Sequence, residues 1–183
     1  MRGLSIIISL ILTTLLFVDA SYAQDNSASV SVNIILHPIQ TIAVNPSQNN
    51  VDLLYLDKED YNQGVSATLD DHLSVTSTGG FQVNVASVQD NFTLSGSDNY
   101  IPVSDVSIRA TNGSDNELAQ TFDDVMLSTS PESLIRSGSG GFNLKYNVTY
   151  DNTAGGADKY VNMTSGDNES IYSSEIIYTI TSK

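Results

Sequence analysis

The 183-residue sequence contains no cysteine and no tryptophan. Without cysteine there is no disulfide, so the fold must depend on packing and backbone hydrogen bonds. Lipid attachment at a bacterial signal-peptide cleavage site is excluded as well, because that modification requires a cysteine. The only histidines are His37 and His72. Zinc usually takes three or four ligands, so we expect no zinc site and two solvated histidines.

Basic residues are scarce, with 7 Lys and Arg against 21 Asp and Glu and a formal net charge of −14. Binding to nucleic acid requires clustered Lys and Arg, so nucleic acid is excluded as a partner. Acidic residues dispersed over loops are typical of a protein that stays soluble outside a cell. The alternative is calcium held by an oxygen-rich loop, for which Asp151 and Asp158 are the candidates. No loop has EF-hand spacing, so we expect no cofactor.

Long hydrophobic runs are absent except near the start, where Leu4 to Val18 is apolar. This run of about 15 residues is shorter than the roughly 20 needed to span a bilayer. It follows Arg2 and precedes Ser21-Tyr22-Ala23, which places small residues where a signal peptidase needs them. We therefore predict a cleaved signal peptide at residues 1–23 and one domain at residues 24–183. The product is expected to be secreted, extracellular or at the cell surface, with the periplasm left open and no transmembrane segment in the mature chain.

Apolar and polar residues alternate with period two along most of residues 24–183, which is typical of half-buried strands. The clearest rows are Phe81–Val85 and Phe142–Tyr150, and Val51–Leu56 is a further strand candidate. About eight to ten short strands separated by turn residues predict an all-β, two-sheet antiparallel sandwich of Ig-like or Greek-key type. Short helical turns are expected at Asp57–Gly64 and Ser130–Gly138, because each has an N-cap residue and a closing glycine.

One short pattern occurs twice. TSTGGFQVNV at residues 76–85 is echoed by SGSGGFNLKYNV at residues 137–148, and the two phenylalanines are 61 residues apart (142 − 81). A glycine pair before a strand predicts positive φ or a bulge. Phe81 and Phe142 are then both expected to point inward at the start of equivalent strands, and one such strand in each sheet is an arrangement that fits. A common structural need and an internal duplication both fit the echo.

The sequence shows no catalytic apparatus. It lacks the G-x-S-x-G motif of a nucleophile elbow. The adjacent pairs Asp70-Asp71 and Asp123-Asp124 do not make the facing carboxylates of a glycosidase, because neighbouring residues on a strand point to opposite faces. We therefore expect the protein not to be an enzyme and to act through its surface.

Two surface functions remain open. Val30, Val32 and Ile34 alternate near the start of residues 24–183, and such a strand can add to the sheet of a neighbouring subunit. The protein would then be a structural or adhesive filament or matrix subunit, although the same strand can also pair within its own domain. The alternative is a carbohydrate- or cell-wall-binding module that uses exposed aromatic residues. The candidate aromatics are Tyr55, Tyr61, Tyr100 and Tyr160.

Three segments carry a family resemblance: V-x-V-N-I-I-L-x-P-I-Q-T-I-x-V from Val30, GGF-x-V-x-V from Gly79, and Y-x-x-x-I-I-Y-T-I from Tyr172. Together with the signal peptide they resemble small secreted proteins of Gram-negative bacteria. More remotely the chain is similar to WxL-like and spore-coat-U-like β-sandwich surface proteins. The resemblance implies a fimbria-like structural or adhesive role at the cell surface, with a surface glycan, a protein or a second copy as partner. Since Trp and Cys are absent, peptidoglycan binding and disulfide-stabilised pilin assembly are not implied.

Overall fold

The structure is a computed structural model that describes residues 27–165 and 169–183. The predicted signal peptide, residues 1–23, lies outside the described residues. The chain divides into two units, residues Met1–Leu36 and His37–Lys183. In the first unit, residues 27–36 form neither helix nor strand. Among the described residues no helix is long and apolar enough to cross a membrane.

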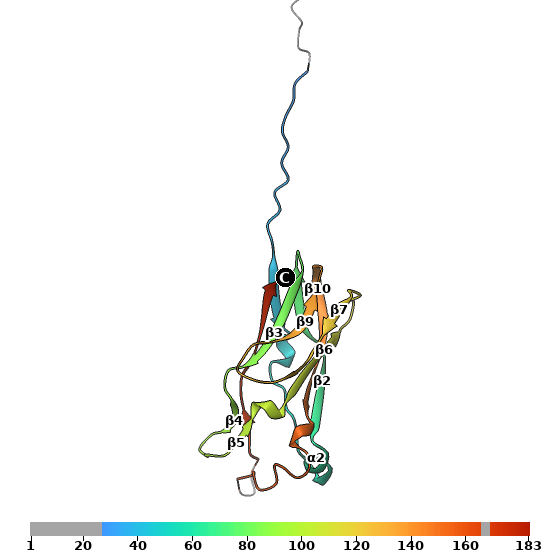
Figure 1. Ribbon diagram of the computed structural model, residues 1–183. Coiled ribbons are helices and arrows are strands. Elements are labelled where there is room, and N and C mark those ends of the chain that lie inside the picture. The colour runs from blue at the N-terminus through green and yellow to red at the C-terminus, as the bar shows by residue number, and fades with distance from the viewer. Residues whose placement is uncertain (1–26, 166–168) are drawn as a thin grey trace, which may run out of the picture. The chain divides into compact units, whose positions relative to one another are not determined.

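The second unit is an antiparallel β-sandwich, which confirms the predicted all-β fold (Figure 1). One sheet has the order β1-β2-β10-β6-β8, with bounds Gln40–Val44, Val65–Ser77, Gly141–Asn152, Ser107–Asn112 and Asp124–Met126. The other main sheet has the order β12-β3-β9-β7, with bounds Ile176–Ser182, Phe81–Ser87, Glu132–Ser137 and Gln120–Phe122. A small sheet has the order β11-β4-β5, with bounds Tyr172–Ser173, Asn91–Leu94 and Tyr100–Pro102.

The core lies between the two main sheets and is built from the alternating rows that the sequence predicts. In β3 the row is Phe81, Val83 and Val85; in β10 it is Leu144, Tyr146, Val148 and Tyr150, and all of these side chains are buried. Fully burying a side chain of this size contributes about 1.5–3 kcal/mol. Rows facing each other from two layers therefore supply the stability that the missing disulfides do not.

The predicted helical turn before β2 is present as α2, Lys58–Gln63. The side chain of Asp57 accepts hydrogen bonds from the N–H groups of Glu59 and Asp60, and the Asp60 carboxylate accepts one from the N–H of Asp57. Gly64 ends the helix with φ 76°, which is unfavourable for other residues. Single 3₁₀ turns lie at η1 Pro46–Gln48, before α2, and at η2 Val103–Asp105 and η3 Thr153–Gly155.

Two local predictions are wrong. Ser130–Gly138 contains strand β9 instead of a helical turn. β9 pairs with β3 on one side and β7 on the other, and both Leu134 and Ile135 are fully buried. This tertiary burial outweighs a favourable N-cap, which contributes only about 1 kcal/mol. The Val51–Leu56 candidate is also not a strand, because this segment pairs with no neighbour.

The echoed sequence forms two short turns that connect the main sheets, one from β2 to β3 and one from β9 to β10. Each turn begins with a buried serine whose Oγ donates to a carbonyl oxygen two residues later. The bonds run from Ser77 to Gly79 O at 2.8 Å and from Ser137 to Ser139 O at 2.7 Å. Since β2 pairs with β10 and β3 with β9, the two turns lie next to each other.

The residues that take equivalent places in the two turns differ by one position from those that the sequence echo aligns. The equivalent serines are 60 residues apart (137 − 77), whereas the phenylalanines are 61 apart. Phe81 is fully buried, as predicted, but Phe142 is 71% exposed, so the prediction that it points inward is wrong. A bulge between Gly141 and Leu144, with Asn143 at φ 55°, makes the inward row of β10 begin at Leu144.

The expectation of positive φ or a bulge at the glycine pairs holds in part, because the second pair is followed by the bulge between Gly141 and Leu144. None of the four has positive φ. Two of them, Gly140 and Gly80, let two backbones approach, because a Cβ on Gly140 would lie 2.2 Å from Ser77 O and one on Gly80 would lie 3.2 Å from Gly138 O. The two turns therefore pack backbone against backbone.

Candidate functional site

The segment before the sandwich exposes an unusual amount of apolar surface. Large apolar side chains at alternate positions are 81–86% exposed, and these are Val30, Val32, Ile34 and Leu36. The intervening positions are polar at Ser29, Ser31 and Asn33 and apolar at Ile35. Residues 28–36 carry no charge and belong to no strand. The predicted assembly residues Val30, Val32 and Ile34 thus have the alternation of a half-buried strand without any burial.

The sandwich presents a free strand edge. β12 is at one edge of its sheet and pairs only with β3. Along the other edge of β12, Ile176–Ser182, no described residue forms a main-chain hydrogen bond. Unpaired strand edges are the places where a further strand can add.

A groove of about 510 Å³ opens beside this edge. Its lining comes from both main sheets, the small sheet and the segment that follows η1. The apolar part of the lining is Val44, Val51, Leu53, Phe92, Val106 and Ile176, and its aromatic polar part is His72, Tyr150 and Tyr178. Glu175 is the only carboxylate among the lining residues. The remaining lining residues are polar and uncharged: Gln48, Asn49, Asn50 and Ser174. The groove therefore combines apolar and polar surface and is only weakly charged.

The groove is also lined by part of a segment, residues 49–55, whose main chain has no hydrogen-bonded neighbour within the described residues. Val51 and Leu53 pack against the core, while Asp52 and Leu54 face outward. Within the described part of the chain, the main-chain N–H and C=O groups of residues 49–55 form no hydrogen bond. The segment has the side-chain alternation of a strand but lacks its ladder.

A directed chain of hydrogen bonds crosses the groove floor. Gln48 Nε2 donates to Asp70 O at 3.0 Å, so Gln48 Oε1 accepts from His72 Nδ1 at 2.9 Å. His72 Nε2 then accepts from the Tyr150 hydroxyl at 2.9 Å, and Tyr150 accepts from Tyr178 at 2.6 Å. The chain joins both main sheets. His72 is buried, so the expectation of a solvated histidine is wrong for it; His37 is exposed.

Burial gives His72 a measurable effect on stability, because desolvation lowers its pKa below the ordinary 6.5. The folded protein holds a neutral ring, whereas the unfolded chain takes up a proton near pH 6.5. The free energy of unfolding should therefore be unaffected by this group above pH 6.5 and should fall as the pH drops from 6.5 toward the folded value, by about 1.4 kcal/mol per unit of pKa depression. Urea unfolding at pH 7.5 and pH 5 measures this slope.

The variant His72→Gln is the control for this slope. It keeps a polar side chain but cannot titrate, so stability should change less between pH 7.5 and pH 5 than in the parent. Asp71, whose pKa is lowered by hydrogen bonds from Ser114, loses its contribution only below its ordinary 3.8 and does not act in this window. Equal slopes in parent and variant would show that His72 is not the titrating group.

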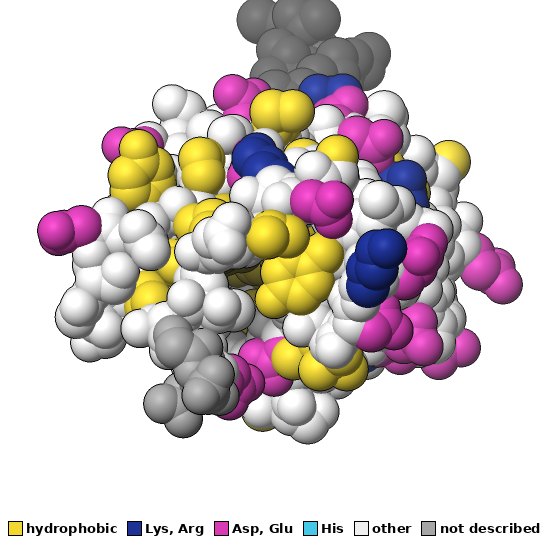
Figure 2. All heavy atoms as spheres, turned by 90° about the horizontal axis from the view of Figure 1, so that it is seen from below, with side chains coloured by type: hydrophobic (Ala, Val, Ile, Leu, Met, Phe, Trp, Pro, Cys, Tyr) yellow, Lys and Arg dark blue, Asp and Glu magenta, His cyan; other side chains and the backbone are white. Residues whose placement is uncertain are grey.

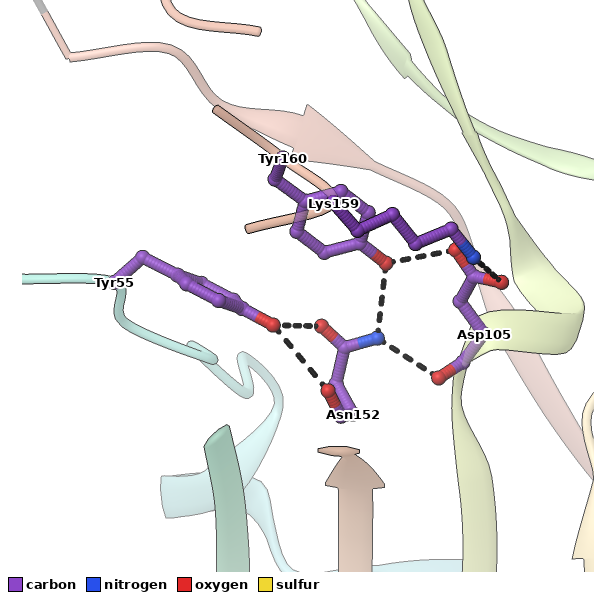
Figure 3. A network of polar contacts seen from close by, with 5 residues as sticks. All are labelled: Tyr55, Asp105, Asn152, Lys159 and Tyr160. Carbon is purple, nitrogen blue, oxygen red and sulfur yellow. Dashed lines mark hydrogen bonds and ion pairs between the residues drawn. The ribbon is translucent and has the colours of Figure 1, made fainter. Parts of the chain in front are cut away.

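A second polar cluster ties loops together at the end of the sandwich near α2 (Figure 3). Asn152 Oδ1 accepts from the Tyr55 hydroxyl at 2.5 Å, and Asn152 Nδ2 donates to Asp105 O at 2.8 Å. The Asp105 carboxylate accepts from Tyr160 at 2.9 Å and pairs with Lys159 at 2.6 Å. Every labelled group points at another member of the cluster, which is the geometry of a structural tie.

The four candidate tyrosines do not form an exposed aromatic platform. Tyr160 is 6% exposed, and Tyr55 and Tyr61 are half-buried, so the expectation of exposure is wrong for these three. Their rings pack together, with centroids 5.2 Å apart for Tyr55 and Tyr61 and 5.5 Å apart for Tyr55 and Tyr160. Burial, with the carboxylate of Asp105 next in effect, raises the pKa of Tyr55 to about 12. Only Tyr100, at 56%, is exposed as expected.

Figure 2 views the end of the sandwich that carries α2, β4 and β5. Hydrophobic side chains gather around a small hollow there, acidic side chains surround much of it, and basic ones are few. Leu56, 80% exposed, precedes α2, and Tyr100 begins β5. Tyr100 is the one well-exposed tyrosine among the residues that the structure describes, and this arrangement does not favour the glycan-binding alternative.

The predicted calcium loop makes turns of its own. Asp151 Oδ1 accepts from Thr153 N at 2.8 Å, and Asp158 is in the left-handed region at φ 60°. Among residues 27–165 and 169–183, no three His, Asp or Glu side chains are placed to hold a metal ion. Asp151 and Asp158 therefore do not belong to a side-chain metal cluster.

Sequence reasoning identified the exposed segment but missed the groove. The groove depends on β12 being an edge strand and on residues 49–55 lacking a partner, and neither follows from local alternation. The available signal was the strand-like alternation at Val51–Leu56, a segment that proved to have no strand partner. The chain matches no protein-family model and has no significant match among curated proteins, so its function must be inferred from these surfaces.

Proposed function

We propose that the protein is an exported, non-catalytic structural subunit of the cell surface that assembles into filaments or a matrix. Each copy gives residues 28–36 as an added β-strand to another copy. The observation that carries this proposal is the exposure of Val30, Val32, Ile34 and Leu36 at alternate positions in a segment without a strand partner.

The physical reason for assembly is the state of this segment. Four large apolar side chains on one face gain about 1.5–3 kcal/mol each when they leave water. A strand added to a free edge also gains main-chain hydrogen bonds, which are insensitive to sequence, while the alternate side chains determine the fit. The proposed export rests on the predicted signal peptide, and the acidic composition keeps the sandwich soluble between assembly events.

Charged substitutions on the apolar face test this proposal. Val32→Asp should weaken self-association at least about tenfold, because a carboxylate would have to enter an apolar groove without a partner. Sedimentation velocity of the purified exported chain measures the distribution of sizes. Gel electrophoresis without boiling shows whether a ladder of stable oligomers persists.

Ser31→Asp is the matched control, since it adds the same charge one residue away on the polar face. It should assemble like the parent. A parent chain that remains monomeric over the accessible concentrations would overturn the proposal, and so would a V32D variant that assembles as well as S31D.

A further inference from the structure

We propose that the acceptor for residues 28–36 is the groove beside β12, and that the added strand of a second copy lies between β12 and residues 49–55. This inference rests on the proposed function, because it names the partner surface for the same segment. It commits to one occupant, a second copy of this chain.

Hydrogen-bonding capacity is the first argument. The groove is lined by the start of β12, at Ile176 and Tyr178, and by residues of the segment 49–55. Both β12 and this segment have unpaired main-chain groups within the described chain. A strand placed between them can pair with both neighbours. A groove that only accommodated side chains would not need unpaired backbone along both walls.

Side-chain chemistry is the second argument. Strand residues point alternately to opposite faces, so pairing beside β12 directs Val30, Val32, Ile34 and Leu36 together toward the groove. The groove lining is apolar at Val44, Phe92 and Val106. The other face of the added strand, with Ser29, Ser31, Asn33 and Ile35, would meet solvent as the exposed residues of β12, which include Ile177, do.

Charge and length also agree. The sandwich of one copy repels that of another, because the whole chain carries a net charge of −14. Residues 28–36 are uncharged, so they are a part of the molecule that can enter another copy without this repulsion. Nine extended residues reach about 30 Å, which is more than enough to run along the part of β12 that lines the groove, Ile176 to Tyr178. The other end of β12 lies beside β1, where Ser182 Oγ donates to Gln40 Oε1 at 3.4 Å.

Disulfide trapping tests the acceptor, and the absence of native cysteine makes the result unambiguous. Ser29→Cys, Ser31→Cys and Asn33→Cys are each combined with Thr179→Cys, an exposed position on β12. Directly opposite residues of paired strands have Cβ atoms about 4.5–5.5 Å apart, close to the separation that a disulfide requires. Three donor positions sample the unknown register. Mild oxidation should convert at least one pair into a ladder of covalent oligomers on a denaturing, non-reducing gel.

The matched control is Thr121→Cys with the same three donor positions, because Thr121 is an exposed threonine on β7, the opposite edge strand of the same sheet. Cross-linked product should be at least about tenfold greater with T179C than with T121C, since only cysteines held side by side react at a raised effective concentration. Equal ladders, or a ladder with T121C alone, would overturn the acceptor and leave strand-mediated assembly standing. If the parent sediments as polymer and none of the T179C variants gives a ladder, the acceptor is likewise overturned. If the parent sediments as monomer and none of the T179C variants gives a ladder, both proposals are overturned.

Discussion

Replacing Gly140 with alanine is expected to destabilise the sandwich by about 3 kcal/mol, at the upper end for overpacking in a rigid site. The added Cβ would lie 2.2 Å from Ser77 O, 2.7 Å from Gly79 N and 2.8 Å from the carbonyl carbon of Thr78. All three atoms belong to the backbone of the neighbouring turn, so no flexible side chain can move aside. Thermal unfolding should show a loss of about 10 °C.

Gly138→Ala is the matched control in the same turn. A Cβ there meets nothing within 4 Å, and the residue does not have positive φ. Alanine should therefore be neutral or stabilise by about 0.4–1 kcal/mol, because it restricts only the unfolded chain. Similar melting temperatures for G140A and G138A would show that the two turns do not pack as described.

The two strands that carry the echoed sequence, β3 and β10, show which part of the fold could be predicted from the sequence and which part could not. The inward rows from Phe81 and from Leu144 were predictable, because alternation reports burial directly. The exposure of Phe142 was not, since it depends on the bulge at Asn143. That bulge is held by residues of β2: Asn143 N donates to Thr76 Oγ1 at 3.0 Å, and Ser74 Oγ donates to Asn143 Oδ1 at 2.9 Å. No local pattern contains these long-range bonds.

The two predicted helical turns show the same difference between local signals and long-range contacts. Asp57–Gly64 was correct because its capping box and closing glycine are local, and nothing else competes for those residues. Ser130–Gly138 was wrong because its apolar pair, Leu134 and Ile135, has a place between two strands. The bulge opposite Val83 lets both side chains face the core. Local propensity predicts secondary structure poorly where the side chains can be buried by tertiary contacts.

The candidate site was only half visible for a related reason. The apolar alternation at Val30, Val32 and Ile34 is written in the sequence, and its exposure in the structure supports the proposed role of a donated strand. The groove is assembled from segments far apart in the chain, such as Val44, Tyr150 and Tyr178. Its polar floor depends on His72, which looked like an isolated surface histidine.

Asn152→Asp is expected to destabilise the fold by about 3–5 kcal/mol at pH 7, because it buries a charge without a partner. Asn152 Nδ2 now donates to Asp105 O and to the Tyr160 hydroxyl, at 2.8 Å and 3.1 Å. The substitution puts an acceptor where the structure needs a donor and adds a second carboxylate beside that of Asp105. The tie between Tyr55, η2 and η3 should loosen, and proteolysis should reach residues 153–165 first.

The pH dependence separates this electrostatic cause from a general packing defect. Repulsion raises the folded pKa of the new carboxyl above its ordinary value of about 3.9, and the protonated form regains a donor. The difference in free energy of unfolding between variant and parent should therefore be largest at pH 7 and shrink as the pH falls toward 4. Asn99→Asp, the same change on an exposed loop residue, should stay within about 0.5 kcal/mol of the parent. A penalty for N152D that is absent at pH 7, or that grows on acidification, would contradict the assigned donor role of Asn152.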